Sequence, residues 1–315
     1  MFQAVPRKTT GFKKASVTMT IMIDGKKIAR NIRRQVKQKI AELETKPRFV
    51  VVQVGENPAS TIYVQHKIKA CRKVGIETVN VNLDSSISEA DLLGLIEGFN
   101  NSSKFHGILV QLPLPEHIRL EPVIEEIHPN KDVDGLHPLN VGRLTVRSKI
   151  PYLHPCTPWG IVHSLDTVYP KKDGVSGLRG KKIAVIGQSL IVGRPLSIML
   201  QNEGATVAMC DVYTKDLKQE VHGADIIVSA TGVVGLVNEA LITATGKEKV
   251  TVIDAGIARL GDKIVGDADL DIYDKVHAIT PVPGGVGPVT VAFLIRNILK
   301  AYCIQHGLPI PTFNQ

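Results

Sequence analysis

Tyr63 and Lys67 are the residues whose types and spacing most directly suggest chemistry. They lie in a predicted helix that Pro58 and Ser60 open and that ends near Gly75. Four positions are about one helical turn, so a phenol and an ammonium group share one face of this helix. Together they could hold a reacting molecule and move a proton. A lysine on an amphipathic helix is more often simply solvated, so this assignment depends on the rest of the chain.

The first half of the chain alternates predicted helices and strands. Apolar residues at every fourth position predict a helix that follows a turn at Asp24–Gly25 and ends near Lys46–Pro47. The other elements are a buried strand over 49–54, the 58–75 helix, a strand over 76–83, a helix over 88–99 capped by Ser88, a buried strand over 107–112 and a short helix over 123–127. This alternation is typical of a parallel α/β sheet, in which ligands gather at the carboxyl ends of the strands.

Three loops after these elements are therefore candidates for a site: 55–58, 111–115 and 131–135. In the second loop, two prolines follow a buried strand and should stop the chain sharply, which fixes Gln111 at the mouth of the sheet. In the third loop, Asp132 and Asp134 could form an acid/base pair or a metal site. They could equally be a solvated acidic turn.

The second half of the chain predicts a further domain that begins at Thr157–Pro158, where a proline lies in the first turn of a helix. A strand over 181–186 runs into Gly187–Gln188–Ser189 and then into a helix near Arg194. A strand, a glycine turn and a helix N-terminus make an anion site from backbone N–H groups and the helix dipole. The spacing matches neither GxGxxG nor GxxxxGK[ST], so this signal is weak by itself.

Asp211 adds to this signal. It follows a strand over 206–210 and lies 24 residues after Gly187, near the place where a Rossmann fold puts its ribose-binding carboxylate. Buried strands over 225–230 and 251–254 follow. We therefore predict an α/β protein with two lobes around a cleft, the second built on a Rossmann-like parallel sheet.

The stretch from Thr280 to Pro288 is dense in proline and glycine. Such a loop is stiff, and its glycines allow the backbone to approach a ligand closely. A plain linker is the alternative, although a linker need not be this stiff. The loop precedes a final helix over 290–302, which we expect to pack back on the first lobe.

Composition narrows the classes of function. The net charge is +8, and only 4% of residues are aromatic, so base-stacking platforms for nucleic acid are not expected. The positive surplus is scattered, apart from the N-terminal tail and the helix over 26–39, and it favours an anionic small molecule. No apolar run reaches the ~18 residues of a membrane span. The four cysteines and ten histidines are dispersed, which predicts neither a metal site nor a disulfide framework.

The N-terminal tail over residues 1–19 is basic and contains no acidic residue. We expect an extended or disordered tail on a cytoplasmic protein. The alternative is a transit peptide that directs the chain to the mitochondrial matrix, because such peptides are basic and poor in acids.

Several of these segments are long and distinctive. They are Val54–Ser60, Tyr63–Ala70, Val110–Pro115, Lys131–Gly135, Pro155–Pro158 and Thr280–Pro288. In this order, over about residues 20–305, the chain resembles the bifunctional methylenetetrahydrofolate dehydrogenase/methenyltetrahydrofolate cyclohydrolase family. The resemblance implies a folate-binding catalytic domain over 20–157 plus 286–315, a Rossmann-like dinucleotide-binding domain over 158–285, and folate in the cleft between them.

The resemblance also implies roles for individual residues. Lys67 would handle protons, Gln111 would hydrogen-bond Lys67, and Tyr63 would pack against and orient the folate. Asp134 would accept hydrogen bonds from the pterin, for which a carboxylate is a geometric match. Pro283 and Gly284 would line the folate side of the cleft. The chain would oxidise 5,10-methylenetetrahydrofolate with a nicotinamide cofactor and hydrolyse the methenyl product to 10-formyltetrahydrofolate.

The predicted cofactor residues are Gly187, Gln188, Ser189, Gly193, Arg194, Asp211 and Ile257. NADP is the cofactor that the resemblance implies. Many relatives carry an arginine where this chain has Gln188, which cannot pair a 2′-phosphate by charge, and a carboxylate at Asp211 favours a ribose diol. Arg194 could still serve the phosphate. NAD is therefore the alternative.

Two other functions stay open on the sequence: a monofunctional NAD-dependent methylenetetrahydrofolate dehydrogenase, and a non-catalytic nucleotide-binding protein. Both would predict loss of cleft residues, yet Tyr63, Lys67, Gln111 and Asp134 are all present. The resemblance further implies a homodimer that forms through the Rossmann lobes, with folate as the partner molecule and neither nucleic acid nor membrane.

Overall fold

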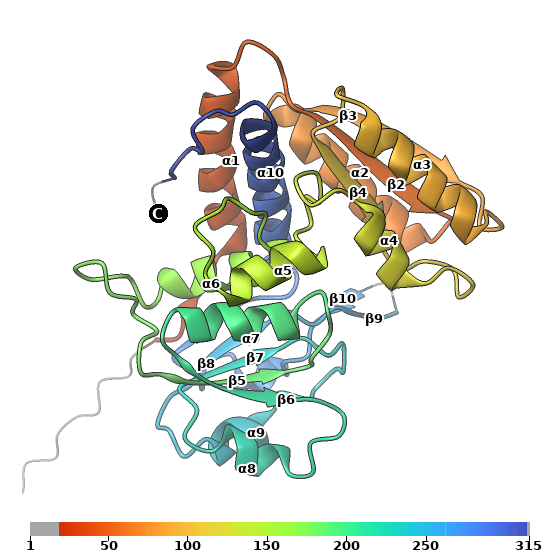
Figure 1. Cartoon of the computed structure of the whole chain (residues 1–315). Helices are drawn as coiled ribbons and strands as arrows, with labels where there is room; N and C mark the ends of the chain where they lie inside the picture. Colours follow the sequence, from red (N-terminus) through yellow and green to blue (C-terminus); the bar gives the residue numbers. More distant parts are fainter. Residues whose placement is uncertain (1–18, 262, 314–315) are drawn as a thin grey trace, which may run out of the picture.

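Two parallel β-sheets divide the chain into two lobes (Figure 1). The structure is a computed structural model that describes residues 19–261 and 263–313. Except for Met19, the predicted N-terminal tail lies outside the described residues, and so does the choice between a transit peptide and a cytoplasmic start.

The first lobe is built on a three-stranded sheet in the order β3–β2–β4, with all pairs parallel. Its elements are α1 (Gly25–Ala41), β2 (Arg48–Val54), α2 (Pro58–Lys73), β3 (Glu77–Leu83), α3 (Glu89–Asn101), β4 (Gly107–Gln111), α4 (Leu120–Glu126), α5 (Pro138–Thr145) and α10 (Val286–Gln305). Val51 packs with α1, α2 and α10 on one face of the sheet, and Val52 packs with α3 and α4 on the other. Because both faces are covered, residues 49–52 in the middle of β2 are all apolar.

The second lobe is a six-stranded parallel sheet in the order β1–β11–β8–β7–β5–β6. Its elements are β1 (Ile21–Met22), β5 (Lys182–Ile186), α7 (Gly193–Asn202), β6 (Thr206–Cys210), α8 (Leu217–Val221), β7 (Ile226–Ser229), α9 (Glu239–Ala244), β8 (Thr251–Asp254), a hairpin of β9 (Ala258–Leu260) and β10 (Lys263–Val265), a 3-10 turn at Leu270–Ile272, and β11 (Ala278–Ile279). Helix α7 covers one face of the sheet, and α8 and α9 cover the other. The predicted Rossmann-like arrangement is confirmed.

Helices α6 (Cys156–Asp166) and α10 join the two lobes. Cys156 lies in the core of the first lobe, whereas Ile161 and Leu165 lie in the core of the second. Helix α10 lies beside α1 (Figure 1), which confirms that the last helix returns to the first lobe. Within the described residues, α10 alone is long and apolar enough to cross a membrane, but most of it is buried inside the fold, as in a core helix of a globular protein.

Some predicted boundaries were wrong. Asp24–Gly25 is not a turn but the start of α1: the Asp24 carboxylate caps the helix by accepting a hydrogen bond from the Lys27 amide at 2.9 Å. Helix α1 ends at Ala41, before the predicted stop near Lys46, and α10 begins four residues before Thr290. Residues 21–22, which we assigned to the first lobe, instead form β1, because their backbone pairs with β11.

His106 ties the C-terminal end of α10 to the start of β4. Its Nδ1 accepts a hydrogen bond from the Arg48 amide (2.9 Å), and its Nε2 lies 3.2 Å from Nε2 of His306. Its carbonyl oxygen accepts a hydrogen bond from the Gln305 amide group (2.8 Å). Burial, together with the charges of His306 and Lys131, lowers the pKa of His106 to about 4. The fold therefore uses this histidine in its neutral form.

Acidification should destabilise the fold through His106. The unfolded chain binds a proton at this residue near pH 6.5 and the folded chain only near pH 4, so stability is lost as the pH falls through this window. We expect His106 to account for a loss of about 2 kcal/mol in the free energy of unfolding between about pH 7 and about pH 5. Urea denaturation of His106→Gln should lack this part of the pH dependence. The control His66→Gln, at an exposed histidine, should retain it. Equal pH dependence in the wild type and His106→Gln would contradict the prediction.

Candidate active site

Helix α2 carries Lys67 into the interior of the first lobe. The helix begins at Pro58, and its cap is Asn57, whose side chain accepts a hydrogen bond from the Ser60 amide at 3.1 Å. Lys67 is only 6% exposed, so the solvated alternative is wrong. Its Nζ donates a hydrogen bond to Oε1 of Gln111 (3.1 Å) and lies 5.0 Å from the centre of the Tyr63 ring. The structure thus brings Tyr63, Lys67 and Gln111 together.

The side chain of Gln111 is oriented by its own loop. Its Nε2 donates a hydrogen bond to the Leu112 carbonyl at 2.6 Å, which turns the amide oxygen toward Lys67. The Ser60 hydroxyl donates to the same carbonyl at 3.3 Å. The helix that carries the lysine therefore also holds the loop that carries its hydrogen-bond acceptor.

The two aspartates of the 131–135 loop have different roles. Asp132 is 2% exposed, and its carboxylate accepts hydrogen bonds from the Gly135 amide (3.1 Å), the His137 amide (2.8 Å) and the Asn140 side chain (2.9 Å). Burial raises the pKa of Asp132 to about 6. The carboxylate oxygens of Asp132 are thus occupied by its own loop and by the start of α5, so Asp132 is a structural residue. This argues against a reactive Asp132–Asp134 pair.

Asp134 is the reactive candidate of this loop. The backbone of Asp132 forms a parallel β-bridge with Ile108 of β4. Because the two segments run in the same direction, Asp134 lies farther along β4, toward Gln111. It is half-buried, and within the described residues no hydrogen bond reaches its carboxylate. Burial raises the pKa of Asp134, and the nearby Lys67 charge opposes this effect. This carboxylate is available to a ligand.

Tyr63 stays a neutral phenol at physiological pH. Burial raises its pKa to about 12, and the charge of Asp134 contributes in the same direction. The buried thiol of Cys71 nearby has its pKa raised to about 12 by burial. The site thus holds a cation, a carboxylate, an amide and a phenol that does not ionise near pH 7.

Gly135 fixes the loop of Asp134 against the start of α6. It has a φ of +75°, and a Cβ at this position would lie 2.2 Å from the His154 carbonyl carbon. The Asp134 carbonyl accepts a hydrogen bond from the Cys156 amide at 3.2 Å. Only glycine allows this approach, so the position of Asp134 depends on the helix that joins the lobes.

Pro283 and Gly284 lie where α10 begins, beside the N-terminus of α1. Pro283 is exposed, and Gly284 is buried with a φ of +116°. A Cβ on Gly25 would lie 1.8 Å from the Gly285 carbonyl oxygen. This loop is therefore held against α1 by backbone packing, which a flexible linker would not show.

The turn between β5 and α7 has the close backbone packing expected of a dinucleotide site. A Cβ on Gly187 would lie 2.5 Å from the Ala230 carbonyl oxygen, and one on Gly193 would lie 1.8 Å from the Gly187 oxygen. The Gln188 side chain turns inward and donates to the Val185 carbonyl (2.9 Å), which leaves its own Oε1 buried without a hydrogen-bond partner among the described residues. Arg194 is exposed at the start of α7.

The other predicted cofactor residues lie at the same edge of the sheet. Ser189 is exposed in the glycine turn, and its hydroxyl accepts a hydrogen bond from the Val192 amide at 3.2 Å. Asp211 follows β6, and one of its carboxylate oxygens accepts a hydrogen bond from the Tyr213 amide at 2.9 Å. Ile257 follows β8 and is 62% exposed. Carboxyl ends of parallel strands are where such folds bind nucleotides.

Comparison with known proteins identifies the two parts of the chain. Residues 23–134 match the tetrahydrofolate dehydrogenase/cyclohydrolase catalytic domain, and residues 155–306 match the NAD(P)-binding domain of the same family. The chain belongs to the tetrahydrofolate dehydrogenase/cyclohydrolase family. The catalytic-domain match ends at Asp134, so the residues gathered around Lys67 all lie within it.

Individual members of the family are similar along nearly their whole length. The chain is 45% identical to the bifunctional protein FolD of Aquifex aeolicus, over 94% of this chain and all of that one. The crystal structure of FolD from Campylobacter jejuni is 41% identical, with a TM-score of 0.84 over 92% of this chain and all of that one. The Trypanosoma brucei enzyme, solved with NADP and an inhibitor, is 33% identical, with a TM-score of 0.83 over 92% of this chain and 98% of that one.

Two buried acids at the cofactor side of this family member escaped our sequence analysis. The Asp254 carboxylate accepts hydrogen bonds from the amides of Gly256, Asp267 and Ala268. Asp267 accepts hydrogen bonds from the Ser229 hydroxyl (2.5 Å) and from the amide and hydroxyl of Thr231 (both 2.8 Å). Together they tie the β9–β10 hairpin to the ends of β7 and β8. The sequence held one signal for this pair: the predicted buried strand over 251–254 ends in an acidic residue, Asp254.

Replacing Asp267 by asparagine should destabilise the second lobe. All three hydrogen bonds reach the same oxygen, Oδ2, and an asparagine amide would either present N–H groups to these donors or leave an N–H group buried. We expect a loss of about 2–4 kcal/mol in the free energy of unfolding by urea denaturation. Asp274→Asn, at an exposed aspartate, is the control and should change it by less than about 0.5 kcal/mol. A similarly small change in Asp267→Asn would show that these hydrogen bonds do not stabilise the lobe.

Proposed function

We propose that the chain oxidises 5,10-methylenetetrahydrofolate to 5,10-methenyltetrahydrofolate with a nicotinamide cofactor and then hydrolyses the product to 10-formyltetrahydrofolate. The observation that carries this proposal is the buried Lys67, which is hydrogen-bonded to Gln111 and lies beside the Tyr63 ring, in a chain whose two halves match the two domains of the family.

Asp134 and Tyr63 would hold the folate for both reactions. The Asp134 carboxylate receives no hydrogen bond from the described residues, so it can accept hydrogen bonds from the amino and ring N–H groups of a pterin. The neutral Tyr63 ring offers a flat apolar surface beside Lys67 against which the folate can pack. In the first reaction the one-carbon bridge loses a hydride, which the nicotinamide accepts when it is bound.

Lys67 would move protons in the second reaction. Water adds to the methenyl carbon and loses a proton, which leaves a hydroxyl group on this carbon. The hydroxyl then loses its own proton and becomes the formyl oxygen, as the bond from the carbon to N5 of the folate breaks and N5 takes up a proton. A buried amine close to these atoms can accept and return a proton without exchange with bulk water. Gln111 keeps the amine in place because its carbonyl oxygen accepts the hydrogen bond from Nζ.

Lys67→Met should abolish hydrolysis of methenyltetrahydrofolate, because it removes the proton-handling group and keeps the length and apolar stem of the side chain. The loss of the methenyl absorbance follows the reaction, and we expect the rate to fall by about 10²–10⁴-fold, the usual contribution of such a group. Folate binding should stay measurable by calorimetry. Lys69→Met, at an exposed lysine on the same helix, is the control and should hydrolyse normally. Unchanged hydrolysis in Lys67→Met would remove Lys67 from the mechanism.

The cofactor that we propose is NADP, bound at the turn between β5 and α7. The residues present fit a dinucleotide: Gly187 and Gly193 bring the backbone close, and the exposed Arg194 could pair a 2′-phosphate. The Trypanosoma brucei relative was solved with NADP. NAD is the alternative, because Gln188 carries no charge and the Asp211 carboxylate would repel a phosphate.

Steady-state kinetics with both cofactors tests this choice. We expect a higher kcat/KM with NADP than with NAD. Gln188→Arg should raise kcat/KM for NADP by about tenfold or more, since an added guanidinium can make charge-assisted hydrogen bonds to the 2′-phosphate. Gln219→Arg, at an exposed glutamine on α8, adds the same charge and should leave the ratio unchanged. A large preference of the wild type for NAD would refute NADP as the cofactor.

We also propose that the chain forms a homodimer through its second lobe. Strand β6 is at the edge of the six-stranded sheet, so one side of its backbone has no partner strand among the described residues. Met209 is 55% exposed, and Val212 and Tyr213, just after the strand, are 91% and 86% exposed. An open edge beside exposed apolar side chains is a suitable surface for pairing with a second copy.

A further inference from the structure

A cluster of aromatic rings and basic side chains lies where α6 meets α10. The ring centres of Tyr152 and His154 are 4.5 Å apart, as are those of His154 and Trp159. The guanidinium carbon of Arg296 lies 4.2 Å from the centre of the Trp159 ring and 4.5 Å from that of Phe313. The cluster therefore joins α6, α10, the loop before α6 and the segment that follows α10.

Lys300 is the second cation of this cluster. It follows Arg296 by four positions, so both side chains leave the same face of α10. Its Nζ lies 3.3 Å from Nδ1 of His154 and 5.7 Å from the centre of the Trp159 ring. Burial, and then the charges of Lys300 and Arg296, hold the pKa of His154 well below its ordinary value. His154 is thus neutral, and its Nδ1 accepts a hydrogen bond from the ammonium group.

The two cations of the cluster lack an acid. Both are half-buried, yet neither forms an ion pair with a residue that the structure describes, and Arg296 donates no hydrogen bond to these residues. Burial lowers the pKa of Arg296 to about 10, and burial together with the Arg296 charge lowers the pKa of Lys300 to about 8. Lys67, by contrast, has the Asp134 carboxylate nearby. The cluster therefore holds positive charge that its described surroundings do not balance.

The aromatic faces compensate for only part of this charge. A cation close to a ring face is attracted by the electrons of the ring. A guanidinium nevertheless has five N–H donors and an ammonium group has three, and these donors require acceptor atoms. Lys300 uses one of them on His154. The remaining donors are suited to anionic oxygens, with which they make their strongest hydrogen bonds.

These donors border a small cavity of about 90 Å³. The described residues that line it are Trp159, Arg296, Leu299, Lys300, Ile310, Pro311 and Phe313, and none of them is acidic. Because a water molecule occupies about 30 Å³ in the liquid, the cavity has room for about three waters or one small oxyanion. A second hollow beside Trp159, of about 340 Å³, includes Asp166 and Glu203 among its lining residues and is the poorer site for an anion.

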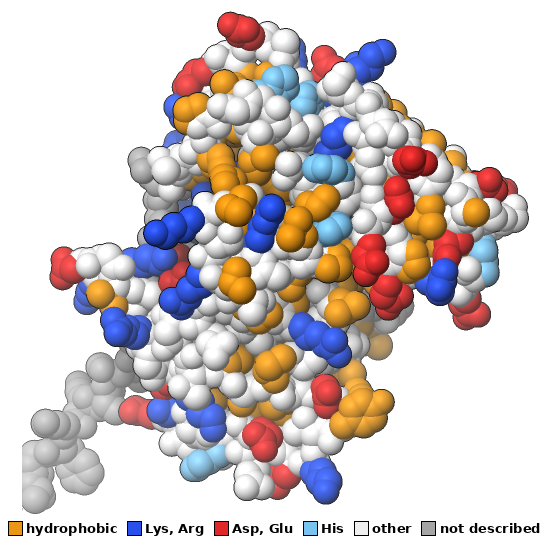
Figure 2. All heavy atoms as spheres, viewed as in Figure 1, with side chains coloured by type: hydrophobic (Ala, Val, Ile, Leu, Met, Phe, Trp, Pro, Cys, Tyr) orange, Lys and Arg blue, Asp and Glu red, His pale blue; other side chains and the backbone are white. Residues whose placement is uncertain are grey.

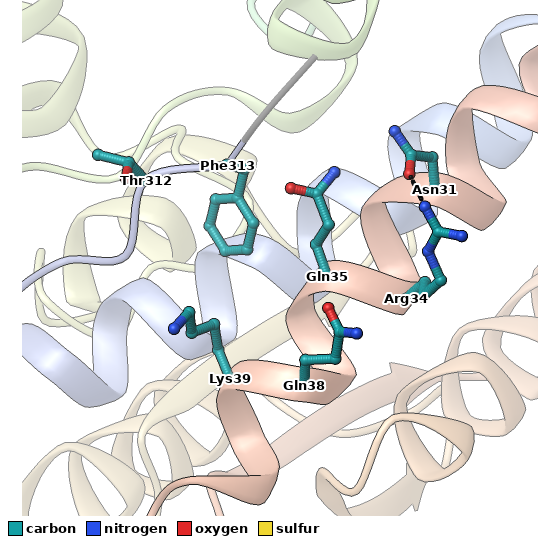
Figure 3. Close-up of a pocket in the computed structure, with 7 residues that line it drawn as sticks. All are labelled: Asn31, Arg34, Gln35, Gln38, Lys39, Thr312 and Phe313. Atoms are coloured by element: carbon teal, nitrogen blue, oxygen red, sulfur yellow. Dashed lines mark hydrogen bonds between the residues drawn. The ribbon is translucent and has the colours of Figure 1, made fainter.

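Phe313 belongs to two spaces. It lines the small cavity and also a wider hollow of about 550 Å³ against α1 (Figure 3). The described residues of the wider hollow include Arg34 and Lys39 and no acid. On the face shown in Figure 2, acidic side chains gather over α3 and α4, across the lobe from the C-terminal segment. An anion that enters past Phe313 therefore meets no opposing charge from these lining residues.

We propose that the cavity bordered by Trp159, Arg296 and Lys300 binds a single phosphate group, either as inorganic phosphate or as the terminal group of a small phosphate ester. A phosphate monoester carries a charge of about −1.5 to −2 near pH 7, so one such group balances both cations. A carboxylate would balance only one. This site lies apart from the turn between β5 and α7, and the inference does not depend on the proposed function.

Trp159 gives the test a local readout, because it is the only tryptophan of the chain. Titration with inorganic phosphate at pH 7 and constant ionic strength should change the fluorescence of Trp159 and reach saturation. We expect a Kd of roughly 1 mM or lower, as two hydrogen bonds between charged groups would provide. Arg296→Gln/Lys300→Gln should bind at least about tenfold more weakly. Sulfate should compete with phosphate, and chloride should give no saturable change.

A matched control removes two positive charges elsewhere, one of them at the predicted cofactor turn. Arg194→Gln/Lys218→Gln, at two exposed positions, should keep the fluorescence response. Loss of the response in this variant would overturn the proposal. So would the absence of a saturable response in the wild type, an equal response to chloride, or tighter binding of acetate than of phosphate.

Urea denaturation supplies a second measurement that does not depend on the optical change. Phosphate should stabilise the wild type more than Arg296→Gln/Lys300→Gln, because a ligand that binds only the folded state stabilises it. The general salt effect of phosphate is common to both proteins. If the double variant does not fold, Lys300→Gln alone should show the weaker binding. Equal stabilisation of the wild type and the folded variant would overturn the proposal.

The same titration distinguishes the two sources of the phosphate group. Tighter binding of glycerol phosphate than of inorganic phosphate would support the site and identify an ester as its ligand. Tighter binding of inorganic phosphate would support the site and identify the free ion.

Discussion

The first lobe is organised by one unusual constraint, a lysine ammonium group that is almost fully buried. A charge removed from water is costly unless hydrogen bonds or other charges compensate for it. Here the Gln111 oxygen, the Tyr63 ring and the nearby Asp134 carboxylate provide this compensation. They come from α2, from the end of β4 and from the loop after α4. The three segments must therefore meet at one point, and that point is where a substrate can be bound.

Close backbone contacts keep these segments in place. Gly135 allows the Asp134 loop to lie against the start of α6, and Gly25 allows the start of α1 to lie against Gly285. On the cofactor side, Asp254 and Asp267 achieve a similar result with hydrogen bonds between strand ends. Contacts of this kind have little freedom to adjust, because a single added carbon would overlap backbone atoms. Both predicted ligand sites are thus positioned by residues that need not touch a ligand.

Charge is distributed differently at the surface and in the interior. Buried charges such as Lys67 and Asp132 have defined partners, whereas most cations of α1 and the Arg194 side chain face solvent. Exposed cations contribute little to the stability of a fold. The position of Arg194 beside the predicted cofactor turn is therefore better explained by binding than by folding.

The sequence alone determined the alternation of elements and the Rossmann-like second lobe, and it made Tyr63, Lys67, Gln111 and Asp134 the candidates for the site. Periodicity, turn residues and long motifs are local properties of the chain. Only the tertiary structure decided that Asp132 is structural, that Ile21 and Met22 join the second sheet, and that Asp254 and Asp267 support the cofactor side. These outcomes depend on which backbone groups from distant segments reach a given side chain. Sequence spacing does not encode such contacts, since they arise only when separate elements pack against each other.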